Sequence, residues 1–387
     1  MNAAAPVPYL SPWATEEIQA LRDTVRRFFE REFVPKYERW LAQGYVDPEA
    51  WRAAGAAGLL CVGIPEEFGG GDGTFAHEAV VIEELERCGI GVNFANTVHS
   101  AILAPYILHC GTEAQKRDWL PQLASGERIG AIAMTEPGGG SDLQAVKTTA
   151  RLEGDTYVLR GSKTFISNGQ IAGLFLVVAQ TSPGSGAKGI SLFLVDGESS
   201  GLRRGRRLEK IGLHAQDTSE IFFDDVRVPA DHLLGLQPGQ GFYQLMQQLP
   251  QERLGIAVAA VAAMERAFEL TLDYTRQRRA FGRAIGEFQT VAFTLAELKT
   301  EAAVARTFVD SCIVRHLRGE LDTATASMAK WWTTERQCHL IDACLQLHGG
   351  YGYMTEYPIA RMHVDARVQK IYGGTNEIMK MLIARAL

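Results

Sequence analysis

The stretch TTARLEGDTYVLRGSKTFI, residues 148–166, decides the fold of this 387-residue chain. It alternates apolar and polar side chains and turns at Gly154-Asp155, a pattern typical of two β-strands in a hairpin. Four more short stretches rich in Val, Ile, Phe and Thr lie nearby: GAIAMTEP, LFLVVAQT, GISLFLVD and SEIFFDDVRVP. Together they predict an all-β unit of roughly 100 residues, a small barrel or sandwich.

Amphipathic stretches with apolar side chains at helical spacing lie on both sides of this β unit. Helices are predicted before it at 15–34, 48–60, 76–89 and 112–126, and after it at 253–279, 288–317 and 321–348. Helix, sheet and helix in that order disfavour a doubly wound parallel sheet, which needs alternating strands and helices. The prediction is an α+β multidomain fold: an N-terminal helical domain (1–128), a central β-barrel-like domain (129–236) and a C-terminal four-helix bundle (237–387).

Composition limits the classes of partner. The formal net charge is −6, which disfavours nucleic acid, and 46% hydrophobic with 22% charged residues is ordinary for a globular protein. The basic run Arg203–Arg207 is interpreted as a solvated strand edge. The six cysteines form no CxxC pair and no zinc spacing, so we expect packed thiols and no metal. No signal peptide or membrane-spanning stretch is apparent, and a cytoplasmic location is predicted.

Near the C-terminus, KIYGGTNEIMK (Lys370–Lys380) places Gly373 and Gly374 before a short polar run. Two adjacent glycines do not suit the middle of a helix. They predict a loop whose backbone approaches another group closely.

Three motifs leave two interpretations each. AMTEPGGGSD (Ala133–Asp142) is either a long turn or a backbone cradle for a flat or anionic ligand, and it lacks the helix context of a dinucleotide fingerprint. In KTFISNG, Phe165 by itself is more readily a core aromatic than a cofactor platform. In RQRRAFGRAIGEFQ (Arg276–Gln289), the arginines either bind a phosphate or complement a helix dipole.

Two further motifs accompany helices. QLHGGYGYMTEYP (Gln346–Pro358) places a glycine pair at a helix stop, with His348 more often structural than catalytic. In LPQERLG (Leu249–Gly255), Pro250 either starts a helix or lies within a continuous one. Glu252 there is either an ion-pair partner of Arg253 or a base above a small apolar helix face.

In order and spacing these motifs resemble the acyl-CoA dehydrogenase family, most closely its long-chain members. The resemblance extends from about residue 15 to the end of the chain. It implies an FAD-dependent α,β-desaturation of a medium- to long-chain fatty acyl-CoA and a homotetramer, a dimer of dimers. It also implies electron-transfer flavoprotein as the electron acceptor.

The resemblance also assigns residues, position by position. Phe165 stands where many members have tryptophan, and Ser167 where they have threonine. FAD would be bound by Met134, Thr135, Phe165, Ser167, Arg278, Phe281, Gln289, Gln346, Gly349, Gly350, Thr375 and Glu377, some of them across a subunit interface. The substrate would be bound by Ser141, Leu249, Arg253, Tyr372 and Gly373.

The catalytic base is the main departure from the commoner family pattern. Many members have a glutamate where this chain has Gly373, whereas the long-chain type carries its base on a C-terminal helix, at Glu252 here. The resemblance implies that the glycine makes room for that carboxylate and that the Gly373 N–H still donates to the thioester oxygen. A carboxylate in a dry apolar pocket is a stronger base than in water.

Three alternatives stay open from the sequence. The chain could be an oxidase of the same fold, a dehydrogenase of carrier-protein-linked acyl groups, or a protein that binds FAD and acyl-CoA without turnover. An intact Glu252 disfavours the last.

Overall fold

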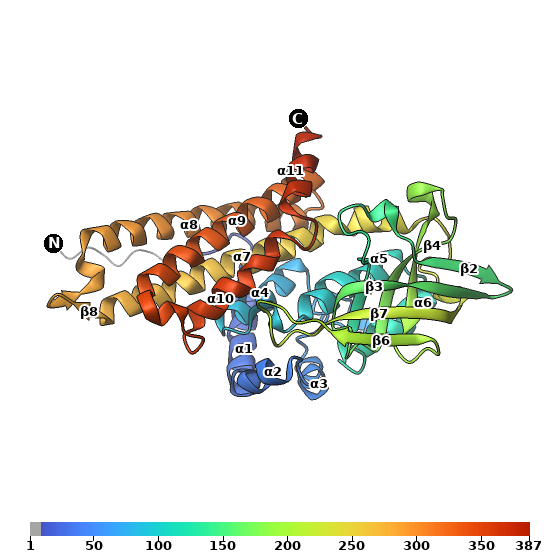
Figure 1. Ribbon diagram of the computed structural model, residues 1–387, viewed down its shortest axis with the longest axis horizontal. Helices are drawn as coiled ribbons and strands as arrows, with labels where there is room; N and C mark the ends of the chain where they lie inside the picture. The colour runs from blue at the N-terminus through green and yellow to red at the C-terminus, as the bar shows by residue number, and fades with distance from the viewer. Residues whose placement is uncertain (1–8) are drawn as a thin grey trace.

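The computed structural model describes residues 9–387 and has three parts in chain order. Figure 1 shows a group of short N-terminal helices, a curled sheet at one end, and long C-terminal helices that extend to the other end. The predicted order of helical, β and helical parts is therefore confirmed.

The central part is one seven-stranded mixed sheet. Six strands follow the order β1-β4-β2-β3-β7-β6, and β5 pairs with β4 off this path. The stretch that opened the sequence analysis forms the antiparallel pair β2 and β3, turning at Gly154 as expected. The basic run Arg203–Arg207 lies on the edge strand β6, as predicted for a solvated edge. The strands are β1 Gly130–Ala133, β2 Thr149–Glu153, β3 Thr156–Ser167, β4 Leu174–Gln180, β5 Ile190–Asp196, β6 Leu202–Arg207 and β7 Thr218–Pro229.

The N-terminal helices begin where threonine supplies a cap. Thr15, Thr74 and Thr112 each accept a backbone N–H in the first turn of the helix that follows. The periodicity did not predict the short helices α2 and α5, nor the π-helical segment Thr97–Leu103 that leads into α5. The helices are α1 Glu16–Glu32, α2 Tyr37–Gln43, α3 Pro48–Ala56, α4 Phe75–Arg87, α5 Ala104–Cys110 and α6 Glu113–Ala124.

The C-terminal part is built on α7, a 37-residue helix that packs against α8 and α9. It continues through Pro250, so the second interpretation of that proline is the correct one. The minor strands β8 (Arg279–Ala280) and β9 (Arg283–Ala284) form a hairpin after α7. The helices are α7 Gly241–Gln277, α8 Gln289–Leu317, α9 Thr323–His348, α10 Pro358–Ala366 and α11 Asn376–Ala384.

The two helical parts share one hydrophobic core. Its largest cluster joins Phe29 and Trp51 from the N-terminal part to Val258 and Ile341 from the C-terminal part, each at most 1% exposed. A core that draws on both ends of the chain fixes the N-terminal helices against α7. The position of α4 relative to α7 therefore does not depend on loops alone.

Buried ion pairs reinforce this contact. Glu83 of α4 forms two ion pairs. Its Oε2 lies 2.6 Å from Nη2 of Arg22 on α1, and its Oε1 pairs with Arg306 of α8. Arg306 in turn binds Glu265 of α7 at 2.8 Å. Because an unpaired charge in such a site is costly, the pairs hold four helices in one arrangement.

No helix of residues 9–387 is both long and apolar enough to cross a membrane. The first eight residues belong to the stretch on which the signal-peptide prediction rests, and they lie outside the described part. The predicted cytoplasmic location stays a prediction.

Candidate active site

The α7 helix presents Glu252 from its first half. Glu252 is 7% exposed, and its neighbours Leu249 and Arg253 are exposed by 7% and 4%. Within the described residues, no Glu252 oxygen lies within 4.0 Å of an Arg253 nitrogen, and Arg253 Nε has no hydrogen-bond partner. The interpretation of Glu252 as an ion-pair partner of Arg253 is therefore wrong.

Glu252 is hydrogen-bonded to a tyrosine instead. The Tyr106 hydroxyl, on α5, donates to Glu252 Oε1 over 2.7 Å. Burial raises the pKa of the Glu252 carboxyl, while the Tyr106 hydrogen bond and the Arg253 charge partly oppose this rise. A buried carboxylate with a raised pKa is suited to act as a general base.

The Gly373-Gly374 loop lies against the same face of α7. Both glycines have left-handed backbone angles, with φ of +64° and +89°, which confirms a loop that favours glycine. A Cβ at position 373 would lie 2.4 Å from Cδ1 of Ile256, one helical turn after Glu252. The space that a side chain at 373 would need is thus filled by Ile256 in this chain.

A buried lysine is hydrogen-bonded to this loop and to the residue that follows it. Lys330 of α9 is fully buried and donates to Gly374 O at 2.7 Å and to Asn376 Oδ1 at 2.9 Å. Burial, together with the nearby Arg253 charge, lowers its pKa to about 7. Tyr106 and Lys330 were both missed from the sequence, because only the folded chain brings them to Glu252 and to the loop.

At the start of the loop Tyr372 is half-buried, and burial raises the pKa of its phenol. At the end Thr375 caps α11 by accepting from the N–H of Ile378, while Glu377 in the first turn is exposed.

Phe165 corrects an expectation. It is 66% exposed rather than part of the core, and its φ is +59°. A bulky residue rarely adopts this angle, and here it lies in a bulge of β3 between Lys163 and Ile166. The bulge turns the ring out of the sheet, leaving a flat apolar surface beside Ser167.

The glycine-rich loop after β1 lies next to this bulge. The Thr135 carbonyl accepts from the N–H of Thr164, and the Met134 carbonyl accepts from Lys163 Nζ at 3.1 Å. A Cβ added at residues 138–140 would approach no atom closer than 3.8 Å, so backbone is accessible there. Ser141 is exposed on the same loop. An exposed aromatic, a hydroxyl and open backbone suit a flat ring system such as isoalloxazine.

A second group of predicted residues gathers at the far end of α7. Arg278, Gln346, Gly349 and Gly350 line one pocket of about 410 Å³. Phe281, in the β8–β9 hairpin, is 96% exposed, and Gln289 starts α8 with an exposed side chain. The structure brings the first four together but does not bring any of the six near Glu252. Gln277, the last residue of α7, lies ~38 Å from Glu252 along a helix that rises 1.5 Å per residue.

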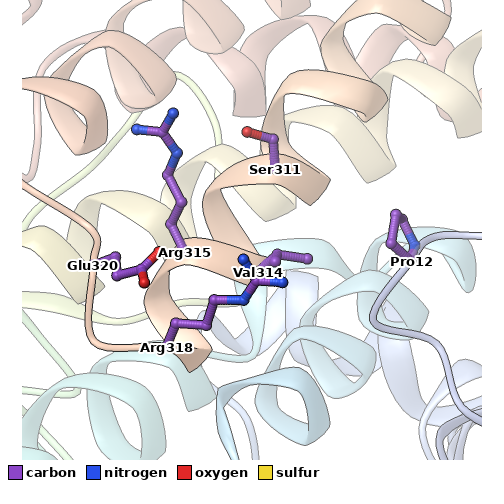
Figure 2. Close-up of a pocket in the computed structure, with 6 residues that line it drawn as sticks. All are labelled: Pro12, Ser311, Val314, Arg315, Arg318 and Glu320. Carbon is purple, nitrogen blue, oxygen red and sulfur yellow. The ribbon is translucent and has the colours of Figure 1, made fainter.

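A further pocket is unrelated to the predicted residues. It has a volume of about 480 Å³ and opens beside the C-terminal end of α8, as Figure 2 shows. Its lining residues are Pro12, Ser311, Val314, Arg315, Arg318 and Glu320.

Comparison with known proteins places this geometry in a family. Three descriptions match in order: "Acyl-CoA dehydrogenase, N-terminal domain" at residues 15–127, "middle domain" at 131–226 and "C-terminal domain" at 239–387. The long-chain specific acyl-CoA dehydrogenase of Sus scrofa mitochondria is 52% identical over 96% of this chain and 87% of its own length. The chain belongs to the acyl-CoA dehydrogenase family.

Two bacterial relatives support the same placement of this acyl-CoA dehydrogenase. One from Bacillus subtilis is 37% identical over 96% of this chain and 98% of its own. The crystal structure of an acyl-CoA dehydrogenase from Geobacillus kaustophilus superimposes with a TM-score of 0.95 at 48% identity, covering 97% of this chain and 99% of the other. The predicted family and fold are confirmed, and the enzyme is an FAD-dependent oxidoreductase.

Proposed function

We propose that this enzyme converts medium- to long-chain fatty acyl-CoA into trans-2-enoyl-CoA, with Glu252 as the base that removes the substrate α-proton. The observation that carries the proposal is the buried Glu252 carboxylate on α7, on the face against which the Gly373-Gly374 loop packs. The 52% identity to a long-chain specific relative supports the chain length.

The residues around Glu252 would have separate roles in binding the substrate and in stabilising the charge that develops on it. Leu249 and Arg253 would line the acyl group beside Glu252, and the Gly373 N–H would donate to the thioester oxygen as charge develops there. Tyr372 would close the substrate side of the loop, and Ser141 would contact the CoA part. Burial keeps water from Glu252 and so keeps its carboxylate basic.

The residues present also fit FAD. Met134, Thr135, Phe165 and Ser167 would hold the isoalloxazine at the bulge of β3, with Thr375 and Glu377 near it. The chemistry that FAD supplies when bound is acceptance of the β-hydride at flavin N5. Because the second group lies ~38 Å along α7 from Glu252, it would serve the FAD of a neighbouring chain. That group comprises Arg278, Phe281, Gln289, Gln346, Gly349 and Gly350.

Assembly and electron transfer are part of the same proposal. A homotetramer would bring the exposed Phe281 of one chain to a neighbour. Electron-transfer flavoprotein would be the acceptor; a chain in the electron transferring flavoprotein structure from Acidaminococcus fermentans is 34% identical to this one.

A panel of acyl-CoAs of graded length, assayed with an artificial electron acceptor, tests the proposal. Each methylene buried in an apolar tunnel adds up to ~0.8 kcal/mol, roughly fourfold in affinity, so activity should rise steeply towards the optimum. Decanoyl-CoA should bleach the flavin anaerobically and turn over faster than butyryl-CoA. Faster turnover of butyryl-CoA would reject the chain length, and peroxide formation without an added acceptor would favour an oxidase.

A further inference from the structure

The hydrogen bond between Tyr106 and Glu252 distinguishes the two oxygens of the carboxylate. Oε1 accepts from the tyrosine over 2.7 Å. Among the described residues, Oε2 has no hydrogen-bond partner. It also differs from the unpartnered polar atoms that are fully buried, because it keeps some exposed surface. One oxygen is therefore held by the protein and the other is left for a ligand.

Tyr106 is itself fixed by packing. Its side chain is fully buried in the cluster that includes Leu103, Ile107, Leu120 and Leu245. A ring packed on all sides has little freedom to rotate, so its hydroxyl is directed at one point. The cost of burying that hydroxyl is met by its bond to Glu252.

The segment that carries Tyr106 is anchored in turn. In the π-helical turn before α5, His99 accepts from the N–H of Gly130 at 2.9 Å and contacts the Leu123 carbonyl at 2.9 Å. Gln251, next to Glu252 on α7, donates to the Ala101 carbonyl at 2.9 Å. Adjacent residues of α7 thus bind the same segment, which keeps the spacing between Tyr106 and Glu252 constant.

The charge state of the tyrosine is also constant. Burial, with the nearby Glu252 carboxylate, raises the pKa of the Tyr106 phenol well above its ordinary value, so it stays a donor at any working pH. Glu252 is faced by Tyr106 from α5 and by Arg253 from α7, and both stabilise the ionised carboxylate. Lys330 of α9 is close enough to Arg253 for that charge to lower its pKa, and it donates to the Gly373-Gly374 loop and not to Glu252.

We propose that Tyr106 is a positioning residue, which holds Oε1 of Glu252 so that Oε2 removes the α-proton of the substrate. This rests on the proposed role of Glu252. In the step, the α-carbon–hydrogen bond breaks and a bond forms between that proton and Oε2, while the electron pair is shared between the α-carbon and the thioester oxygen as an enolate. In turnover the same pair becomes the α,β double bond as the hydride leaves the β-carbon. Tyr106 keeps its own proton throughout.

Proton exchange tests the proposal without turnover. The probe is an acyl-CoA whose β-carbon is replaced by sulfur, so no hydride can leave and only the α-proton exchanges with D₂O. Exchange is followed by NMR across a range of pH in wild type, Tyr106→Phe, Glu252→Gln and Tyr157→Phe. Tyr157 is a buried tyrosine of the central sheet and serves as the matched control.

Tyr106→Phe should slow exchange about tenfold at the plateau, because the carboxylate loses its fixed orientation. Its acid limb should move to higher pH, since the hydrogen bond that favours the ionised form is gone. Flavin content and affinity for the probe should not change, because the ring still fills its place in the core. Tyr157→Phe should match wild type.

Two outcomes contradict the proposal in different ways. If Tyr106→Phe exchanges within about twofold of wild type with an unmoved acid limb, Tyr106 has only a packing role. If Glu252→Gln still exchanges the proton, Glu252 is not the base, and the proposed function fails along with the role of Tyr106. In a double variant with Glu252→Gln, the Tyr106 substitution should have no further effect.

Discussion

The α7 helix and the Gly373-Gly374 loop meet at one candidate site, but the helix contributes a side chain and the loop contributes backbone. The helix brings a side chain, Glu252, clamped by Tyr106 from α5. The loop brings only backbone, clamped by Lys330 from α9. A reactive group on a helix is placed more rigidly than one on a loop, whereas glycines let a loop approach a ligand closely. In the proposed site, the carboxylate and the amide donor therefore come from separate elements.

The largest effect should come from the helix side. Glu252→Gln keeps the size of the side chain and removes the basic oxygen, so turnover should fall at least ~10³-fold. FAD content and acyl-CoA binding should persist, measured by absorbance and by titration with substrate. Turnover within about tenfold of wild type would show that Glu252 is not the base.

Moving the carboxylate to the loop should give a smaller effect. In Glu252→Gln, adding Gly373→Glu restores an acid, but its Cβ would lie 2.4 Å from Ile256 at a φ of +64°. We therefore expect little recovery until Ile256→Ala opens the space, and then a gain of about tenfold in turnover over the single variant.

The matched control for this experiment is Glu252→Gln with Ile256→Ala and no new acid. Equal recovery in the control would mean that the gain comes from space alone. The left-handed backbone costs a non-glycine residue roughly 1–2 kcal/mol, so recovery to the wild-type rate is not expected.

The smallest effect should come from Lys330, through the pH dependence of the free energy of unfolding. The folded-state pKa of Lys330, about 7, is below the ordinary 10.5, so between these values the folded protein binds fewer protons than the unfolded one. Lys330 therefore makes the free energy of unfolding rise with pH across this window. Lys330→Met should flatten that rise.

Denaturant unfolding at several pH values across the window measures this effect. Lys188→Met removes an exposed lysine and should leave the pH dependence unchanged. A Lys330→Met curve parallel to wild type would mean that the buried lysine does not titrate in this range.

Much of the fold could be predicted, because periodicity records which face of each element is buried. The long helices α8 and α9 and the hairpin β2–β3 lie where the sequence placed them. The short helices α2 and α5 were not predicted, because a seven-residue helix contains too few turns to produce a recognisable hydrophobic periodicity. The family and its FAD dependence followed from ordered motifs and are confirmed.

Less of the candidate site could be predicted from the sequence, because its contacts join residues that are far apart in the chain. Glu252 stood out only through the missing acid at Gly373, and its role stays a prediction. Phe165 was wrongly favoured as core, since composition cannot reveal a bulge that reverses a side chain. Tyr106 lies 146 positions from Glu252, and no local pattern connects residues so far apart.

The shared core has a consequence for synthesis of the chain. Phe29 and Trp51 leave the ribosome early, but Val258 and Ile341, in the same cluster, leave it much later. Until then the face of α4 that packs against α7 is uncovered, and Glu83 has no Arg306. The nascent N-terminal part should therefore depend on chaperones, and a chain that stops before α7 should aggregate instead of forming an independent domain.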